Sequence, residues 1–428
     1  MTQVRRILFL VFFLAGLLSP FHALADIWTL NPGLATQRFL NRENDENSTF
    51  LQLLADISYQ SIQWDLSLDL ELRWDTQSKD FDDSVWNRRG DFLRPVETLM
   101  FTGRDGGFSA GLDRLRNWTP GGGYLVRDLS GYGEIDYVLP GFRLQWEKKD
   151  LKMELGMDRP IDPSVEAGAV IWEPGGKVRL IVEGAVDPEA PESFTGDSSG
   201  GRPVADSTRR LSGSAAGFLF SLRDGQVLDI QAGAHTARLG GEGSGLGWEI
   251  RASMDLSSYY LHRLSLGFGS VQCSGGYVPA WFEAIYPMRR WGLSGLPLLA
   301  AYPMDAQVQD RRMDMFDARY ELGTSLKISA GIDRFTDDSL TRGRVHMEII
   351  EPGGRGLTAT LWSQADGPEE DLFTEEADLY TRISALLAFM PHTLVTISYD
   401  HSWAFQEENA APVPLSSIVL GVMYNISL

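Results

Sequence analysis

Cysteine is almost absent from this chain, which has a single one, Cys273, in 428 residues. One cysteine cannot form an intramolecular disulfide, and it cannot supply the several thiolates of a metal cluster. The fold must therefore hold together without covalent cross-links, and the composition predicts no metal site and no cofactor.

Basic residues are also scarce. The chain has 38 Lys and Arg against 58 Asp and Glu, and its formal net charge is −20. A surface of this charge repels phosphate backbones, which argues against nucleic acid as a partner.

Long apolar runs are missing except for residues 7–18, near the N-terminus. Arg5 and Arg6 precede this run, and Ala23-Leu24-Ala25 before Asp26 has the pattern of a cleavage site. Residues 1–25 are therefore predicted to be a signal peptide, which leaves 26–428 as the folded domain. No later run is long enough for a membrane helix, and apolar residues at helical spacing are nearly absent.

Alternation of apolar and polar residues is what the chain has instead. From Ile62 the sequence reads I-Q-W-D-L-S-L-D-L-E-L-R-W-D. Successive side chains of a strand point to opposite faces, so this stretch predicts a strand with one apolar and one charged face. Residues 51–60 have the same period, which favours a tight hairpin. The second strand has about 13 residues, which is close to the length that a tilted strand needs to cross a bilayer. Leu66, Leu68 and Leu70 are therefore expected to face lipid.

Strands of this kind recur throughout the chain. They are predicted at 96–102, 108–115, 142–147, 151–157, 178–182, 211–222, 227–235, 246–256, 259–268, 316–322, 326–335, 344–351, 357–363, 379–389, 394–403 and 418–428. An exported, acidic, all-β chain of alternating strands is typical of a transmembrane antiparallel β-barrel in the outer membrane of a Gram-negative-type (diderm) bacterium. We expect about 20 strands, an even number between roughly 16 and 22.

Loop lengths predict the topology, because such barrels have short periplasmic turns and longer external loops. Counted back from the C-terminus, residues 390–391, 352–355, 323–324 and 257–258 are then periplasmic turns. Alternation of the two sides leads us to expect that 277–286 and 291–302 both cross as strands. It also makes 117–140 a single external loop. Residues 187–210, rich in Pro, Gly, Ser and Asp, are expected to form another loop.

The closing stretch has an apolar residue at every second position from Ile418 to Leu428. It resembles the C-terminal signal that bacterial outer-membrane barrels present to their insertion machinery. The usual last residue is aromatic, whereas here it is Leu428. The resemblance implies that the insertion machinery and outer-membrane lipid are partners.

Two segments between residues 97 and 187 form a further pattern. They read Thr102-Gly103-Arg104-Asp105-Gly106 and Thr119-Pro120-Gly121-Gly122-Gly123-Tyr124. This part of the chain resembles uncharacterised outer-membrane proteins of spirochaetes and Bacteroidetes. Those proteins have a Tyr-Gly-x-x-Gly-Asp-type turn followed by a Thr-Leu-Gly-x-Gly segment, from which Pro120 departs. The resemblance implies an outer-membrane protein and no particular activity.

Motifs of catalysis occur only outside their required context. Residues 107–111 match G-x-S-x-G, but the nucleophile elbow needs a helix after the turn, and a strand pattern stands there. Residues 241–247 are rich in glycine, yet a strand follows them instead of the helix that a phosphate loop needs. Five histidines lie beyond the signal peptide, namely His235, His262, His346, His392 and His401. None has the spacing of a metal pair, so no catalytic residue and no metal ligand is predicted.

Acidic residues cluster at 43–46, 80–83, 369–371 and 375–376, all in predicted external loops. Such clusters can hold calcium or magnesium against lipid head groups. None has the spacing of an EF-hand loop, so we interpret them as solvated loops.

The polar face of each strong strand is expected to line the lumen. Its basic members are Arg73, Arg143, Lys152, Arg179, Arg251, Arg263, Arg319, Lys327, Arg344 and Arg382, and its acidic members are Asp65, Asp69, Glu71, Glu147, Glu154, Glu183, Glu249, Asp255, Asp317, Glu321, Asp333, Glu348 and Asp378. The two sets are comparable in size, so strong ion selectivity of the wall is not expected. A lumen with this many charges is filled with water or with ion pairs. A barrel of about 20 strands is too wide for side chains alone to fill, so water or an inward-folded loop must occupy the rest.

These features predict a porin-like channel for the passive passage of small hydrophilic solutes, and not an enzyme. Two alternatives are a barrel that transports nothing and binds partners through its loops, and a membrane-embedded hydrolase. Conductance distinguishes the first two, and a lipid or peptide turnover assay tests the third.

Overall fold

The computed structural model describes residues 27–40, 47–82, 90–115, 118–129, 139–199, 202–225, 227–240, 243–256, 262–275, 277–282, 286, 310–337, 340–351, 355–365, 367–374, 377–390, 392–404 and 413–427. Within these ranges, 20 antiparallel strands form a closed barrel, and a two-residue strand continues the last of them. The predicted signal peptide, residues 1–25, lies outside the described residues.

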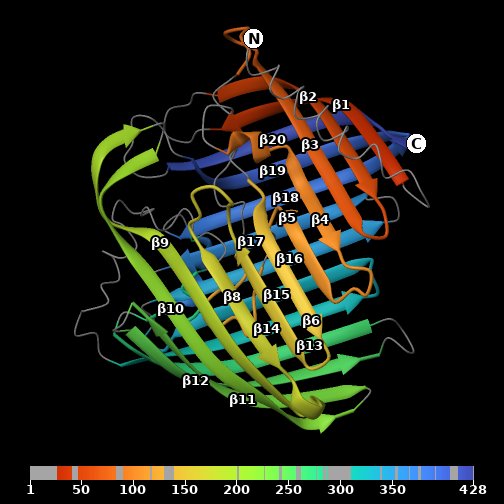
Figure 1. Ribbon diagram of the computed structural model, residues 1–428. Helices are drawn as coiled ribbons and strands as arrows, with labels where there is room; N and C mark the ends of the chain where they lie inside the picture. The colour runs from red at the N-terminus through yellow and green to blue at the C-terminus, as the bar shows by residue number, and fades with distance from the viewer. Residues whose placement is uncertain are drawn as a thin grey trace.

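The strands follow one another around the wall in chain order (Figure 1). They are β1 (Ile27–Leu40), β2 (Asn47–Gln60), β3 (Trp64–Asp75), β4 (Val96–Thr102), β5 (Phe108–Asp113), β6 (Gly141–Lys148), β7 (Leu151–Met157), β8 (Glu166–Trp172), β9 (Val178–Ser199), β10 (Arg202–Asp224), β11 (Leu228–Leu239), β12 (Gly243–Asp255), β13 (His262–Ser274), β14 (Arg311–Leu322), β15 (Leu326–Phe335), β16 (Thr341–Glu351), β17 (Arg355–Ala365), β18 (Asp378–Met390), β19 (Thr393–Ala404), β20 (Val413–Tyr424) and β21 (Ile426–Ser427). Three short 3-10 helices lie in the described connections: η3 (Asp91–Leu93), η4 (Pro174–Gly176) and η5 (Glu369–Phe373).

The barrel closes between the two ends of the chain. β1 pairs with β2 on one side and with β20 and β21 on the other, in register Gly33↔Met423 and Thr29↔Ser427. Closure removes the free edges of the sheet, so each strand satisfies its backbone groups within the wall. The prediction of an all-β antiparallel barrel of about 20 strands is confirmed.

No helix among the described residues is long and apolar enough to span a membrane.

The apolar stripe of most strands faces outward, as alternation predicts. On β12, Leu246, Trp248 and Ile250 are exposed, whereas Glu249 between them is buried. On β20, Ile418, Leu420, Val422 and Tyr424 are exposed in the same way. A closed wall with exposed apolar side chains at alternate positions is the surface that lipid requires.

The prediction that Leu66 and Leu68 face lipid is wrong: both lie on the outward face of β3 but are buried there, and Leu70 is half-buried. Leu66 and Leu68 are buried in a cluster with Tyr59 and Val96, against which Trp28 and other apolar side chains pack. Leu51 and Leu53 of β2, on the same face, are exposed.

Two topological predictions were wrong, and one strand was not predicted. β13 pairs directly with β14 along its length, so residues 277–286 do not cross between them; residues 291–302 lie outside the described residues. Residues 187–199 and 202–210 are not a loop, since they belong to β9 and β10, which have 22 and 23 residues. A first strand, β1, precedes the first predicted hairpin. Because only β13 and β14 lie between them, the β12–β13 and β14–β15 connections are at the same end of the barrel, as predicted; residues 257–258 lie outside the described residues.

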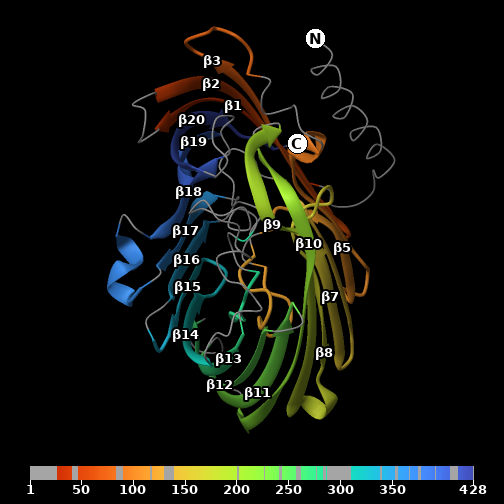
Figure 2. The same cartoon turned by 90° about the vertical axis from the view of Figure 1, so that its left-hand side faces the viewer.

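The connection between β5 and β6 is a single loop, as predicted, because these two strands pair directly. Its described part, residues 118–129, folds into the barrel together with residues 277–282. Figure 2 shows both segments between the opposite walls. They pack in one large apolar cluster with inward residues of β8–β11 and β13–β15, among them Ile181, Leu219, Val271 and Phe335. One half of the interior is therefore a packed core.

Candidate functional site

The inserted loop is held by its own backbone and by its neighbour. Trp118 and Leu129 pair across it, and Val126 pairs in parallel with Phe282 of the second inserted segment. The Ala280 N–H donates to the Tyr124 carbonyl at 3.0 Å, and the Phe282 N–H donates to the Leu125 carbonyl at 3.1 Å. The two segments thus form one ordered body inside the barrel.

Glu183 on β9 fixes the tip of this loop. Its carboxylate accepts four successive backbone N–H groups, those of Gly122, Gly123, Tyr124 and Leu125, the last three at 2.9, 3.0 and 3.1 Å. Successive N–H groups that converge in this way form an anion-binding concavity. A Cβ atom at Gly121, whose φ is +64°, would stand 2.7 Å from the Glu183 carboxylate, so only glycine permits this approach.

Tyr124 extends the attachment to β11 and β12. Its hydroxyl donates to Glu249 at 2.8 Å, and its ring stacks on His235 with the centroids 4.1 Å apart. Burial and the adjacent Glu249 carboxylate raise the pKa of the Tyr124 phenol above its ordinary value. The phenol therefore stays protonated and remains a donor at neutral pH.

An ion network holds the other end of the loop. Asp333 on β15 lies 3.4 Å from Arg127, 3.4 Å from Arg342 and 3.0 Å from Arg344. Arg344 also pairs with Asp128 of the loop at 3.2 Å and with Asp317 on β14. The loop thus places one positive charge, Arg127, and one negative charge, Asp128, against wall residues of the opposite sign.

The other half of the interior contains a polar cavity of about 550 Å³. Its lining comes from β1–β4 with the β3–β4 and β5–β6 connections on one side, and from β16–β20 on the other. The lining reaches from Ile350, Gly356 and Met423, beside the short turns or the end of β20, to Tyr380 and Ser402 near the other ends of their strands, so the cavity extends along the barrel.

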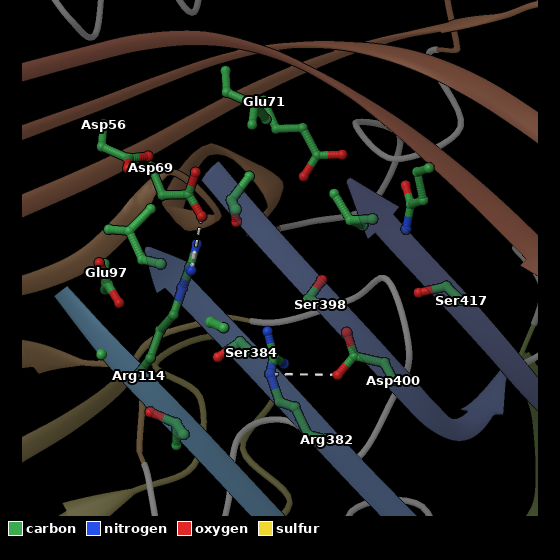
Figure 3. Close-up of a pocket in the computed structure, with 18 of the residues that line it drawn as sticks. Asp56, Asp69, Glu71, Glu97, Arg114, Arg382, Ser384, Ser398, Asp400 and Ser417 are labelled. Atoms are coloured by element: carbon green, nitrogen blue, oxygen red, sulfur yellow. Dashed lines mark hydrogen bonds and ion pairs between the residues drawn. The ribbon is translucent and has the colours of Figure 1, made fainter. Parts of the chain in front are cut away.

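The two walls of the cavity differ chemically (Figure 3). Carboxylates gather on β2–β4, at Asp56, Asp69, Glu71 and Glu97. Hydroxyls gather on β18–β20, at Ser384, Ser398, Ser402 and Ser417.

Most of these carboxylates have defined contacts. Arg114 pairs with Asp69 at 3.1 Å and donates to the Arg94 carbonyl at 2.9 Å. Arg382 pairs with Asp400 across two neighbouring strands at 3.4 Å. Gln52 donates to Glu71 at 2.7 Å. Asp56 and Asp69 stand directly opposite each other in the β2–β3 register.

Most of the residues predicted for the lumen fall into three groups, and three of them belong to none. Glu183, Glu249, Asp317, Asp333 and Arg344 anchor the inserted loop. Asp69, Glu71, Glu348 and Arg382 line the cavity. Others form ion pairs along or between strands: Arg73–Asp82, Arg143–Asp113, Lys152–Glu154, Arg179–Glu173, Arg251–Glu249, Arg263–Asp255, Arg319–Glu321 and Lys327–Glu348. Asp65 and Glu147 are exposed near strand ends, and Asp378 begins β18 opposite Gln364.

Several site residues were not predicted. Asp56 has the polar register of β2, and Glu97 lies in the short strand β4; alternation alone could have nominated both. Arg127 and Asp128 lie in a loop without periodicity, where the only sequence signal was the glycine run before them.

The structure also shows the surroundings of the two glycine-containing motifs and of the histidines. Ser109 of the G-x-S-x-G match lies in β5, and β12 begins within the glycine-rich stretch, so strands stand where helices would be needed. His262, His346 and His401 each contact a hydroxyl, at 2.6, 2.9 and 2.8 Å. In the described part of the chain, no three potential metal ligands come together.

Comparison with known proteins gives structural likeness only. No protein-family model matches the chain, and no curated protein matches it. Among solved structures, OccK8 (OprE) of Pseudomonas aeruginosa matches at 10% identity with a TM-score of 0.35, over 94% of this chain and 98% of that chain. OccK2 (OpdF) of the same organism, in complex with glucuronate, matches at 9% identity with a TM-score of 0.36, over 94% and 96%. The outer membrane protein opdK matches at 10% with a TM-score of 0.35, over 94% and 99%. Likenesses this weak carry no inference about solute or partner.

Proposed function

We propose that this protein is an outer-membrane channel that lets small hydrophilic solutes cross passively. The observation that carries the proposal is the polar cavity inside a closed barrel whose outer surface is apolar. Backbone groups are satisfied within the wall, so lipid meets apolar side chains and solutes meet charges and hydroxyls.

The passage in this proposal is off-centre. The inserted loop and the apolar residues of β8–β11 and β13–β15 fill one half of the lumen. Solutes then pass along β1–β4 and β16–β20, where charged and hydroxyl side chains line the cavity. Glu183 and the Asp333 network keep the loop against the far wall, so the loop sets the width of the passage.

The remaining predictions complete the proposal. Residues 1–25 direct export and are removed, and 26–428 form the barrel. The closing strand presents its C-terminus to the insertion machinery. The resemblance of residues 97–187 to outer-membrane proteins of spirochaetes and Bacteroidetes supports the same location.

Single-channel recording of the refolded protein in planar bilayers tests this function. We expect stepwise conductance that persists at 1 M salt. Preparations that are folded by heat-modifiable electrophoretic mobility, yet show no conductance, would rule out a channel.

A further inference from the structure

The charges inside the barrel are sorted by position, although their totals are comparable. Among the described residues that line the cavity, six are carboxylates and three are arginines. The arginines of the loop network, Arg127, Arg342 and Arg344, stand outside this cavity. The cavity therefore has a local excess of negative charge that the register count of the whole lumen conceals.

The acidic wall also brings like charges together. Asp56 and Asp69 are direct cross-strand neighbours on β2 and β3, an arrangement that costs stability when both are charged. Glu71 and, on β4, Glu97 add further carboxylates to this wall (Figure 3). Arg114 already pairs with Asp69 at 3.1 Å, but the carboxylates of this wall outnumber it. A further cation placed between them would relieve their remaining repulsion, and a low-dielectric wall behind them would strengthen its attraction.

The opposite wall of the cavity offers hydroxyl groups, so a ligand that contacts both walls needs a second kind of polar group. Ser384, Ser398 and Ser417 come from three neighbouring strands and present hydroxyls to the cavity. Hydroxyls both donate and accept hydrogen bonds, so they match the hydroxyls of a sugar-like solute. A bare metal ion would leave this wall unused.

We propose that the cavity is a binding site for a small polyhydroxylated solute that carries an amine, such as an amino sugar. The ammonium group lies against Asp56, Asp69 and Glu97, and the hydroxyl groups of the solute contact the serines of β18–β20. The volume of about 550 Å³ accommodates a monosaccharide with water around it. This inference rests on the proposed channel function and names the class of solute.

Glucosamine and glucose form a matched pair of probes, since they differ at one ring position, where an ammonium group replaces a hydroxyl. In bilayers at pH 6, we expect glucosamine to interrupt the ion current at about tenfold lower concentration than glucose. Asp56→Asn removes one carboxylate and should raise the glucosamine concentration needed by about tenfold. Asp150→Asn is the control, because Asp150 is an exposed acid in the β6–β7 turn that does not line the cavity.

The serine wall has its own test. The double variant Ser384→Ala with Ser398→Ala should weaken the block by glucosamine and leave the block by methylammonium unchanged, because only glucosamine has hydroxyls. Asp56→Asn is expected to fold, since it relieves the repulsion with Asp69. Glu97→Gln provides a second acid variant with the same expected direction.

The outcomes separate this inference from the channel proposal. Normal conductance with equal block by glucose and glucosamine, or with equal behaviour of Asp56→Asn and Asp150→Asn, overturns the amine site and leaves the channel intact. An absence of conductance overturns the channel. In that case titration calorimetry of glucosamine against glucose in detergent still decides whether the cavity binds the amine.

Discussion

Asp333 shows how much of the interior depends on one side chain. It is buried and lies within 3.4 Å of Arg127, Arg342 and Arg344. Asp333→Asn leaves three arginines around a neutral group, and loss of one partner from a buried ionic cluster costs about 3–5 kcal/mol. Asp314→Asn is the control, because its pair with Arg312 at 2.9 Å is partly exposed and contributes about 0–1 kcal/mol. Reversible refolding into bilayers measures both, and equal costs would contradict the anchoring role of Asp333.

Ile250 tests the lipid-facing surface. It is exposed near the middle of β12, next to the buried Glu249. Ile250→Arg places a charge against lipid and should cost about 2–4 kcal/mol if that position is near the midplane. Ile62→Arg makes the same change at an exposed residue in the β2–β3 turn and should cost about 0–1 kcal/mol. A refolding free energy that is the same for both variants would mean that Ile250 does not face lipid.

Single residues could be assigned to a face from the sequence wherever alternation was strong. Leu246 and Ile250 were expected outside, and they are. Contact partners could not be assigned, because Glu183 meets residues of a loop about 60 positions away, and no period connects the two. The left-handed glycine at 121 is the one local signal of that meeting, since it marks a close approach of the backbone.

The inserted loop depends on the carboxylate that receives its tip. Glu183→Gln keeps one oxygen acceptor and turns an NH₂ group toward backbone donors, so part of the cradle around Gly122–Leu125 is lost. We expect faster proteolysis within 118–129 and larger, noisier conductance, with the barrel still folded. Glu189→Gln, at an exposed position of the same strand, should change neither. Identical protease patterns for the two variants would show that Glu183 does not hold the loop.

The closing seam depends on the short strand β21. Ile426 and Ser427 pair with Leu30 and Thr29 of β1 and extend the contact of β20. Deletion of residues 426–428 removes this pairing and the end of the predicted insertion signal, so less protein should reach the outer membrane. The amount of heat-modifiable barrel in membrane fractions measures this. Ser427→Thr, which keeps the full length of the chain, is the control. Normal amounts after the deletion would contradict the role of this end.

Strands could be predicted where one of their faces is apolar and contacts lipid. Strands and segments without such a face could not. Alternation does not predict β1, because Asn31, Pro32 and Gly33 interrupt the pattern. Its pairing with β20 stops at Gly33 and resumes with β21 at Leu30, so Pro32 lies where the missing N–H costs no ladder bond on that side. Residues 277–286 were predicted to cross only because the alternation of the two sides allowed it, and a direct pairing of β13 with β14 satisfies the same alternation. The outer parts of β9 and β10 lack alternation, which is why they were interpreted as a loop.

The whole barrel has a polar and a packed half, and this division is invisible in its sequence. Inward positions of β8–β15 include Ile181, Ala185, Leu219 and Val271, which cover the inserted segments. Inward positions on the opposite side include Asp69, Glu71 and Arg382. Counting the inward charges of all strands by their register combines the two halves and gives similar numbers of basic and acidic residues. Only the arrangement of strands around the wall separates an acidic cavity from the loop network, in which arginines and aspartates are balanced.

Selectivity of the complete channel should also depend on its outer mouth. The connections after β1, β3 and β17 lie at the end opposite the short turns, and each carries acidic residues. Their field concentrates cations at low salt, and salt screens it within about 10 Å at 0.1 M. We expect a weak cation preference that fades towards 1 M, and joint replacement of Glu369, Glu370 and Asp371 by Gln, Gln and Asn should reduce it.

The three acids of η5 are not equivalent in this test. Glu369 pairs with Arg334 on β15, so its replacement also frees a positive charge, whereas Glu370 is exposed on the same short helix. Glu370→Gln alone should therefore lower the reversal potential in a salt gradient less than the triple change does. High-salt conductance should stay the same in both variants, because the cavity that limits the flow is untouched. Reversal potentials that do not move in the triple variant would assign the cation preference to the acidic wall of the cavity instead of the mouth.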